Sequence, residues 1–174
     1  MKVAGKFEKV SFEEFKKSFE EKFGTDKNIK EIYDKIKLPK RATVGSAGYD
    51  FFSPISFTLK PNESIDIPTG IRCYMTPGWV LKCYPRSSLG YKYRIQMDDS
   101  VPIIDQDYYY SDNEGHIFLK ITNDTKDNKD CEVLEGTGFA QGIFVEFGIT
   151  LDDMVSDIRN GGFGSTTKHM KEEK

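Results

Sequence analysis

The most informative stretch of the chain is IRCYMTPGWVLKCY, residues 71–84. It contains two apolar runs, Ile71–Met75 and Trp79–Tyr84, which are rich in β-branched and aromatic residues. Between them lies Thr76-Pro77-Gly78, whose proline and glycine favour a turn. Runs of this length, bounded by turn residues, predict two short strands separated by a tight turn.

Short runs of the same kind occur on both sides. Strands are expected at Phe57–Leu59, Ser64–Ile67, Ile117–Thr122, Cys131–Leu134 and Gly142–Ile149, with turns at Lys60–Glu63 and Pro68–Gly70. The polar run Asn123–Asp130 is interpreted as a solvated hairpin loop. Several short strands at this spacing predict an all-β barrel or jelly roll rather than a βαβ fold.

In residues 1–39 the apolar residues follow a helical spacing after the first ten residues. Residues 1–10 predict a short strand, and Ser11 with Glu14 fits a capping box at the start of a helix. The helix carries an apolar stripe of Phe12, Phe15, Phe19 and Phe23, and Gly24 is expected to end it. A second short helix is expected from about Asn28 to Pro39.

We interpret the two helices as an appendage docked on the barrel, with a partner-binding element as the alternative. The predicted organisation is residues 1–37 as N-terminal strand and helical appendage, 38–155 as β-barrel, and 156–174 as a C-terminal glycine-rich arm.

The composition limits the class of protein. A chain of 174 residues with 37% hydrophobic residues forms one ordinary domain with a real core. A net charge of -3 gives no global signal for nucleic acid, so any phosphate must be held by a local site. Because no apolar run is long enough to span a bilayer and the N-terminus lacks a signal-peptide core, we expect no membrane association and a cytoplasmic location.

The cysteines and histidines are few. Cys73, Cys83 and Cys131 lack metal-type spacing and are expected to be reduced structural thiols. His116 and His169 are too few for a histidine-rich metal site and are expected at the surface.

The C-terminal run Arg159–Lys168, RNGGFGSTTK, combines glycines, hydroxyls, cations and one aromatic ring. Glycine-rich backbone can form an anion-binding nest, and Ser165 and Thr166 add neutral donors. The ring of Phe163 can stack on a base. The run predicts an arm that closes over a phosphate-bearing planar ligand, and a loose tail is the alternative.

Four further clusters have a similar character. They are Gly45–Asp50, Arg86-Ser87-Ser88, Ile104-Asp105-Gln106-Asp107-Tyr108 and Ala140-Gln141. A guanidinium and two hydroxyls at a strand end suit phosphate oxygens. Asp105 and Asp107 are expected to point the same way on a strand, an arrangement that serves acid–base work or a cation. The alternatives are ordinary turns and a strand end with solvated acids.

The five motifs together, in this order, resemble those of the trimeric dUTPase family, and they span residues 45–168. The resemblance implies a jelly-roll subunit and a homotrimer with active sites at the subunit interfaces. One chain would supply the hairpin around Asp105, a second the phosphate-binding residues, and the third its C-terminal arm.

The resemblance also implies a reaction. dUTP and water would give dUMP and pyrophosphate, which removes dUTP and supplies dUMP for dTMP synthesis. A magnesium ion would be bound through the substrate triphosphate, without direct protein ligands. Asp105 would orient and deprotonate the attacking water, Tyr108 would pack against the sugar, and Asp50 would support the metal through water. The implied substrate-binding residues are Arg86, Ser87, Ser88, Tyr108, Gln141, Arg159, Phe163, Gly164, Ser165 and Thr166.

The chain departs from the family pattern in four places. Pro102 stands where glycine is usual, and Gly138 and Phe139 stand where arginine and isoleucine are usual. The connection Tyr109–Gly115 is longer than usual, and Arg159 lies one residue closer to Phe163. Two alternatives are a deaminase of the related dCTP deaminase class, which relies on a catalytic glutamate in its central motif, and a catalytically idle binding module on the same fold.

Overall fold

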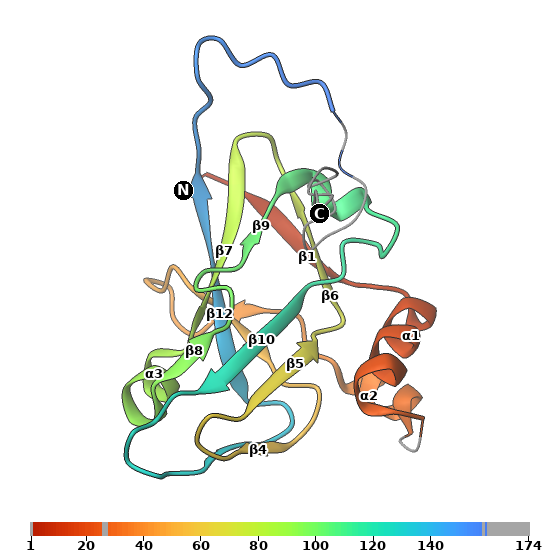
Figure 1. Cartoon of the computed structure of the whole chain (residues 1–174). Coiled ribbons are helices and arrows are strands. Elements are labelled where there is room, and N and C mark those ends of the chain that lie inside the picture. The colour runs from red at the N-terminus through yellow and green to blue at the C-terminus, as the bar shows by residue number, and fades with distance from the viewer. Residues whose placement is uncertain (1, 26–27, 158, 160–174) are drawn as a thin grey trace, which may run out of the picture.

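The computed structural model describes residues 2–25, 28–157 and 159, and strands dominate it (Figure 1). The strands are β1 Gly5–Lys9, β2 Lys40–Arg41, β3 Tyr49–Phe52, β4 Phe57–Leu59, β5 Ser64–Pro68, β6 Ile71–Met75, β7 Trp79–Pro85, β8 Ile95–Met97, β9 Ile103–Ile104, β10 Phe118–Asn123, β11 Cys131–Val133 and β12 Gly138–Glu146. The helices are α1 Phe12–Phe23, α2 Ile29–Lys35, α3 Ser87–Tyr93 and the 3₁₀ helix η1 Gln106–Tyr110.

The strands form small antiparallel sheets. A five-stranded sheet has the order β2-β3-β12-β7-β9, and a three-stranded sheet has the order β5-β10-β8. The pairs β1–β6 and β11–β4 complete the arrangement. This architecture of mostly strands confirms the predicted all-β class.

Residues 71–84 fold as their sequence pattern predicts. β6 covers Ile71–Met75 as expected and β7 runs one residue further, to Pro85. Gly78 has a φ of 86°, which the turn between the strands requires and a side chain would resist. The two strands join different sheets, because β6 pairs with β1 whereas β7 pairs with β12 and β9.

Helix α1 begins at the predicted cap. The Ser11 hydroxyl accepts a hydrogen bond from the Glu14 amide at 3.1 Å. The reciprocal half of the capping box is absent, because the Ser11 amide donates instead to Glu114 Oε2 at 2.8 Å. The helix ends at Gly24, with φ at 77° and its amide bonded to the Glu20 carbonyl.

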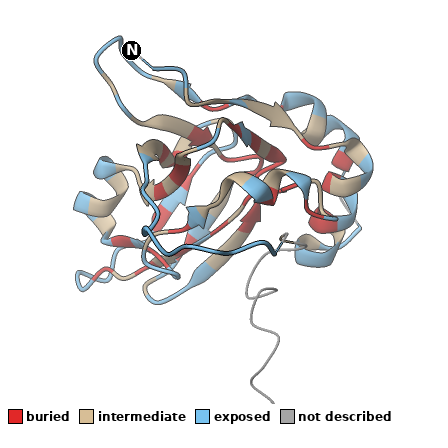
Figure 2. Cartoon of the chain, turned by 90° about the horizontal axis from the view of Figure 1, so that it is seen from above, coloured by how far each residue is buried: buried red, intermediate tan, exposed pale blue. Residues whose placement is uncertain are grey.

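The phenylalanine stripe packs inward. Phe15 and Phe19 are fully buried, and they belong to the same core cluster as Ile67 and Phe51. Buried positions, red in Figure 2, lie both in the strands and on the N-terminal helices. Burying a ring of this size stabilises the fold by roughly 2–3 kcal/mol, so α1 is held mainly by its packing.

Three expectations about local structure were wrong. Asp105 and Asp107 do not lie on one strand, because β9 ends at Ile104 and the Tyr108 amide bonds back to the Asp105 carbonyl at 3.2 Å to open η1. Residues 123–130 are not a hairpin loop, because β10 pairs with β5 and β8 while β11 pairs with β4. β12 covers Gly138–Glu146 rather than Gly142–Ile149, because pairing with β3 and β7 extends it upstream.

The expectation that His116 lies at the surface was also wrong. Its side chain is fully buried, and its Nε2 accepts a hydrogen bond from the Gly70 amide at 2.9 Å. His169 lies outside the described residues.

The thiol expectation is confirmed. Cys73, Cys83 and Cys131 are free and buried. Burial raises the pKa of Cys73 to about 12 and that of Cys131 to about 11, and it raises the pKa of Cys83 further. Thiols of this kind stay protonated and unreactive at neutral pH. Within residues 2–25, 28–157 and 159, no helix is long and apolar enough to cross a membrane.

Candidate functional site

The first group of predicted site residues gathers where β7 ends. In the sheet register Gln141 on β12 faces both Asp50 on β3 and Tyr84 on β7. Arg86 follows β7 directly, and its Nε lies 3.2 Å from Asp50 Oδ1. The side-chain amide of Gln141 donates a hydrogen bond through Nε2 to the Pro85 carbonyl at 3.1 Å. One cation, one carboxylate and one neutral donor therefore share this end of the sheet.

Two glycines leave room for these side chains. A Cβ at Gly138 would lie 2.9 Å from Arg86 Nη1 and 3.0 Å from its Cδ. A Cβ at Gly48 would lie 2.4 Å from Gln141 Oε1. Glycine at both positions lets the guanidinium and the amide lie close against backbone. This gives a physical reason for glycine at 138, where the sequence departs from the family pattern.

Ser87 and Ser88 follow Arg86 as the first residues of α3, a helix that the sequence did not predict. Both are exposed. Because they are exposed, their hydroxyls are open to solvent next to Arg86 in the sequence.

The second group lies around the start of η1. Arg159 Nη2 is hydrogen-bonded to Asp105 Oδ2, and Arg159 Nε lies 3.2 Å from Asp107 Oδ1. The two carboxylates therefore converge on one cation although they are not on a strand. The sequence predicted Arg159 as a substrate-binding residue, and in this chain it is paired with the predicted base.

Tyr108, the third residue of η1, is buried. Its hydroxyl donates to the His116 carbonyl at 2.7 Å and accepts from Asn113 Nδ2 at 2.8 Å. Burial raises the pKa of the Tyr108 phenol above its ordinary value. The sequence reasoning missed Asn113 and His116 as supports for this ring, and the turn-forming run Asn113-Glu114-Gly115 was the available signal.

The two groups lie far apart within one chain. Ile104 faces Leu81 across β9 and β7, so Asp105 lies level with Val80. Arg86 is six residues further along, which places it roughly 20 Å away at about 3.3 Å per residue. Figure 1 shows α3 and the short helix after β9 at opposite ends of β7. A single chain therefore does not bring the predicted base to the predicted phosphate-binding residues.

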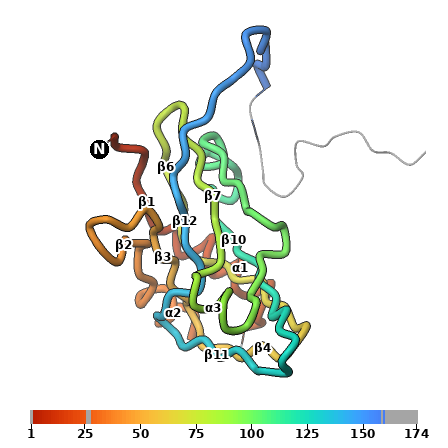
Figure 3. The backbone as a smooth tube through the Cα atoms, turned by 90° about the vertical axis from the view of Figure 1, so that its left-hand side faces the viewer, coloured from red at the N-terminus to blue at the C-terminus, as the bar shows by residue number. Residues whose placement is uncertain are grey.

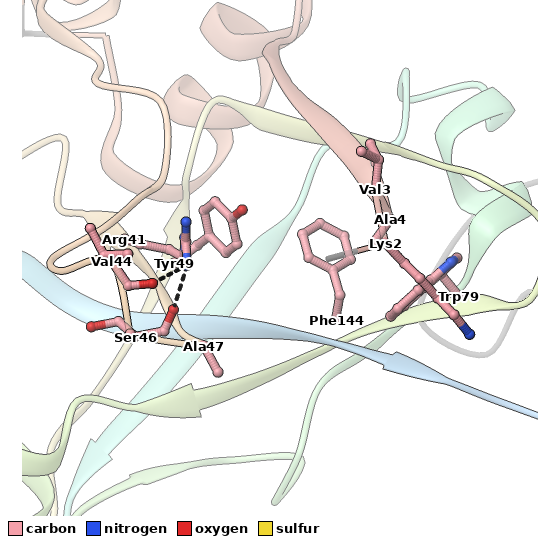
Figure 4. Close-up of a pocket in the computed structure, with 12 residues that line it drawn as sticks. Lys2, Val3, Ala4, Arg41, Val44, Ser46, Ala47, Tyr49, Trp79 and Phe144 are labelled. Carbon is pink, nitrogen blue, oxygen red and sulfur yellow. Dashed lines mark hydrogen bonds between the residues drawn. The ribbon is translucent and has the colours of Figure 1, made fainter.

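A groove of about 490 Å³ lies between the start of the chain and the first motif (Figure 4). Tyr49, Trp79 and Phe144 give it an aromatic lining. Arg41 donates to the carbonyls of Val44 at 2.8 Å and Ser46 at 3.1 Å, which shapes the loop on one side. The lining includes none of Asp50, Arg86 or Asp105, so this groove is separate from both groups.

A direct protein metal site is not evident in the part of the chain that the structure describes, which contains no cluster of three or more His, Cys, Asp or Glu able to hold a metal ion. Phe163, Gly164, Ser165 and Thr166 lie outside the described residues.

Comparison with known proteins connects these observations. The family model described as dUTPase matches residues 34–167. The chain belongs to the dUTPase family. The match includes β2 to β12 and both groups of predicted site residues, and it leaves out β1 and α1.

Individual relatives also support membership of the dUTPase family. The chain is 40% identical over 134 residues to the deoxyuridine 5'-triphosphate nucleotidohydrolase of Lactococcus lactis subsp. lactis (strain IL1403), covering 75% of this chain and 88% of that protein. It is 36% identical over 141 residues to the enzyme of the same name from Paraburkholderia xenovorans (strain LB400), covering 76% and 90%. These relatives confirm the predicted family and enzyme class.

Solved structures show the same fold. The dUTPase of Streptococcus mutans has a TM-score of 0.60 and 32% identity, covering 83% of this chain and 97% of its own. The dUTPase of phage phi11 of S. aureus, which coordinates a structural Mg(II) ion, has a TM-score of 0.56 at 21% identity and covers 70% and 90%. The latter likeness concerns the fold alone.

Proposed function

We propose that this chain hydrolyses dUTP to dUMP and pyrophosphate by attack of water on the α-phosphorus. Phosphoryl chemistry of this kind needs mainly positioning and charge neutralisation. The observation that carries the proposal is the pair of side-chain groups on a dUTPase fold: Arg86 with Asp50 and Gln141, and Asp105 at the start of the short helix that carries Tyr108.

Asp105 is the proposed base that orients and deprotonates the water. In the structure it is hydrogen-bonded to Arg159, which competes for the same carboxylate oxygen. We therefore expect Arg159 to leave Asp105 and pair with substrate phosphate when the arm closes, since phosphate offers the guanidinium a bidentate partner. The hydroxyl of Tyr108 is held by two hydrogen bonds, which suits the proposed role of packing against the deoxyribose.

The Arg86 group is the proposed triphosphate site. Arg86, Ser87, Ser88 and Gln141 would donate to phosphate oxygens. A magnesium ion on the triphosphate would neutralise part of its charge, and Asp50 would support that ion through water. The donor set fits this role, because magnesium keeps several waters and needs few protein carboxylates.

The roughly 20 Å between Asp105 and Arg86 supports a homotrimer with shared sites. We propose that Asp105 of one chain meets Arg86 of a neighbour. The segment after β12 extends beyond the strands in Figure 3 and exposes the apolar side chains of Ile149, Leu151, Met154 and Val155. Apolar residues in an extended segment suit burial against another copy.

Several finer expectations accompany this proposal. The antiparallel sheets suit a jelly-roll subunit, with residues 1–37 as an appendage and 156–174 as the arm. Phe163 is proposed to cover the uracil, while Gly164, Ser165 and Thr166 reach the phosphates. A cytoplasmic location and a supply of dUMP for dTMP synthesis fit the chemistry and stay predictions.

The test is pyrophosphate release from dUTP, dCTP, dTTP and UTP measured side by side with magnesium. We expect turnover of dUTP and at least a hundredfold slower turnover of the others, since a site that hydrogen-bonds its substrate discriminates strongly. Ammonia release from dCTP would instead indicate the deaminase class. Binding of dUTP without turnover would indicate an idle binding module.

A further inference from the structure

The loop that follows Tyr108 is tied to the N-terminal segment that lies outside the matched family region. Glu8 Oε2 accepts a hydrogen bond from the Tyr109 hydroxyl at 2.5 Å. Glu114 accepts two from Ser11, at 2.8 Å from its amide and 2.6 Å from its hydroxyl. Segments about a hundred residues apart in sequence thus meet beside the nucleoside half of the proposed site.

The loop needs an external restraint, because part of its backbone is strained. Glu114 has a φ of 58°, in the left-handed region that non-glycine residues rarely adopt. Gly115 follows with a φ of 71°, and a Cβ there would lie 2.7 Å from the Tyr109 Cα. Ser11 holds the Glu114 carboxylate on one side, and Arg72 Nη1 lies 3.7 Å from it on the other.

A second set of contacts joins α1 to His116, at the C-terminal end of the loop. The Gly70 amide donates a hydrogen bond to His116 Nε2 at 2.9 Å. Because Nε2 is the acceptor, the ring proton lies on Nδ1. That nitrogen lies 3.3 Å from Glu14 Oε1 and 3.3 Å from the Ser18 hydroxyl, both on α1. The backbone carbonyl of the same histidine accepts the Tyr108 hydroxyl at 2.7 Å.

These contacts form a continuous path from α1 to the ring that is proposed to face the sugar. We propose that Ser11 and Glu14 are positioning residues, which hold the loop so that the ring of Tyr108 keeps one fixed place against the deoxyribose. The inference rests on the proposed function, in which Tyr108 packs against the deoxyribose and so leaves no room for a ribose 2'-hydroxyl. The N-terminal helix is then part of the specificity apparatus.

The first test uses Ser11→Ala in the full-length protein. The variant loses the hydroxyl bond to Glu114 Oε1 and keeps the backbone amide bond to Oε2. We expect the KM for dUTP to rise about fivefold and the preference for dUTP over UTP to fall by a similar factor. We expect kcat to stay within about twofold, because Asp105 is untouched. Ser11→Thr keeps the hydroxyl and should restore KM and preference.

Because Ser11→Ala also removes the cap of α1, a second variant and a control separate positioning from folding. Glu114→Gln leaves the cap intact and should shift KM and preference in the same direction. Tyr33→Phe loses a bond from α2 to the Val10 carbonyl, 2.6 Å long, without touching the loop. It should lower the melting temperature and leave KM and preference unchanged.

The outcomes are distinct. Ser11→Ala and Glu114→Gln variants that melt lower but keep the wild-type KM and preference would overturn the positioning role while leaving dUTP hydrolysis intact. A wild-type protein that does not hydrolyse dUTP would overturn the proposed function and this inference with it.

Discussion

The Arg86 guanidinium lies against a backbone position that only glycine leaves open. Gly138→Ala would place a Cβ 2.9 Å from Nη1 and 3.0 Å from Cδ of Arg86. The backbone at 138 tolerates alanine, so the flexible arginine moves instead. We expect the KM for dUTP to rise severalfold, by about 1 kcal/mol of binding, with the melting temperature nearly unchanged.

Gly90→Ala is the matched control for this variant. Gly90 lies on α3, close in sequence to Arg86, and a Cβ there meets nothing within 4 Å. Its KM should equal that of the wild type. Equal KM values for the Gly138 and Gly90 variants would show that the placement of Arg86 does not matter for substrate binding.

Asp105 makes the clearest prediction about chemistry. Asp105→Asn keeps the shape of the side chain and removes the proton acceptor, so turnover should fall by roughly a hundredfold or more. Binding of a non-hydrolysable dUTP analogue, measured by calorimetry, should change little. A variant with near-normal turnover would remove Asp105 from its proposed role.

At the scale of elements, the regular strands could be predicted from the sequence. β4, β6 and β7 lie within one residue of their expected bounds, because alternating apolar residues and turn residues agree there. The cap at Ser11 and the stop at Gly24 were equally local signals.

The errors share a cause, which is pairing between distant segments. Asp105 was predicted on a strand because apolar residues precede it, but β9 ends at Ile104. His116 looked exposed because nothing local indicates that Glu14 and Gly70 surround it. Asn123 looked like a loop residue, yet its buried amide donates to the Leu59 and Lys129 carbonyls.

The candidate site also contains residues that the sequence predicts and contacts that it does not predict. Motif order identified Asp105, Arg86 and Gln141, because these residue types carry the chemistry. No local pattern indicates the pairing between Arg159 and Asp105, because it depends on where the chain returns after β12. The supports of Tyr108 were missed for the same reason.

The contact between Glu14 on α1 and His116 predicts an acid-sensitive contribution to stability. Burial raises the pKa of Glu14, but hydrogen bonds from His116 and Ser18 lower it by more, so its native pKa lies below the ordinary 4.5. The unfolded chain therefore binds this proton at higher pH than the native chain. Glu14 contributes stability above pH 4.5 that is lost as the pH falls through its native pKa.

Denaturant unfolding of the wild type and Glu14→Gln at several pH values checks this. The difference in the free energy of unfolding should be constant well above pH 4.5 and shrink below it, since His116 and the other groups are common to both proteins. A difference that does not depend on pH would show that the Glu14 charge adds nothing to the docking of α1.

Over the whole molecule, the two groups of candidate site residues lie apart, and we propose that each is one half of a shared site. Arg86 and Asp105 lie at opposite ends of β7, and the segment after β12 leaves the sheets with apolar side chains exposed. The proposed homotrimer would account for the separated groups and for the exposed apolar segment, because closed cyclic symmetry lets each chain lend one half-site to each neighbour.

Subunit mixing tests this central claim most directly. Asp105→Asn and Arg86→Ala are each expected to be inactive alone. When the two variants are co-expressed in equal amounts, half of the chains carry each intact residue, so about a quarter of the shared sites receive an intact Asp105 from one chain and an intact Arg86 from another. The account predicts dUTP turnover at about a quarter of the wild-type rate in the mixture. If both residues acted within a single chain, no mixed oligomer would hold an intact site, and a mixture as inactive as its parents would contradict the account.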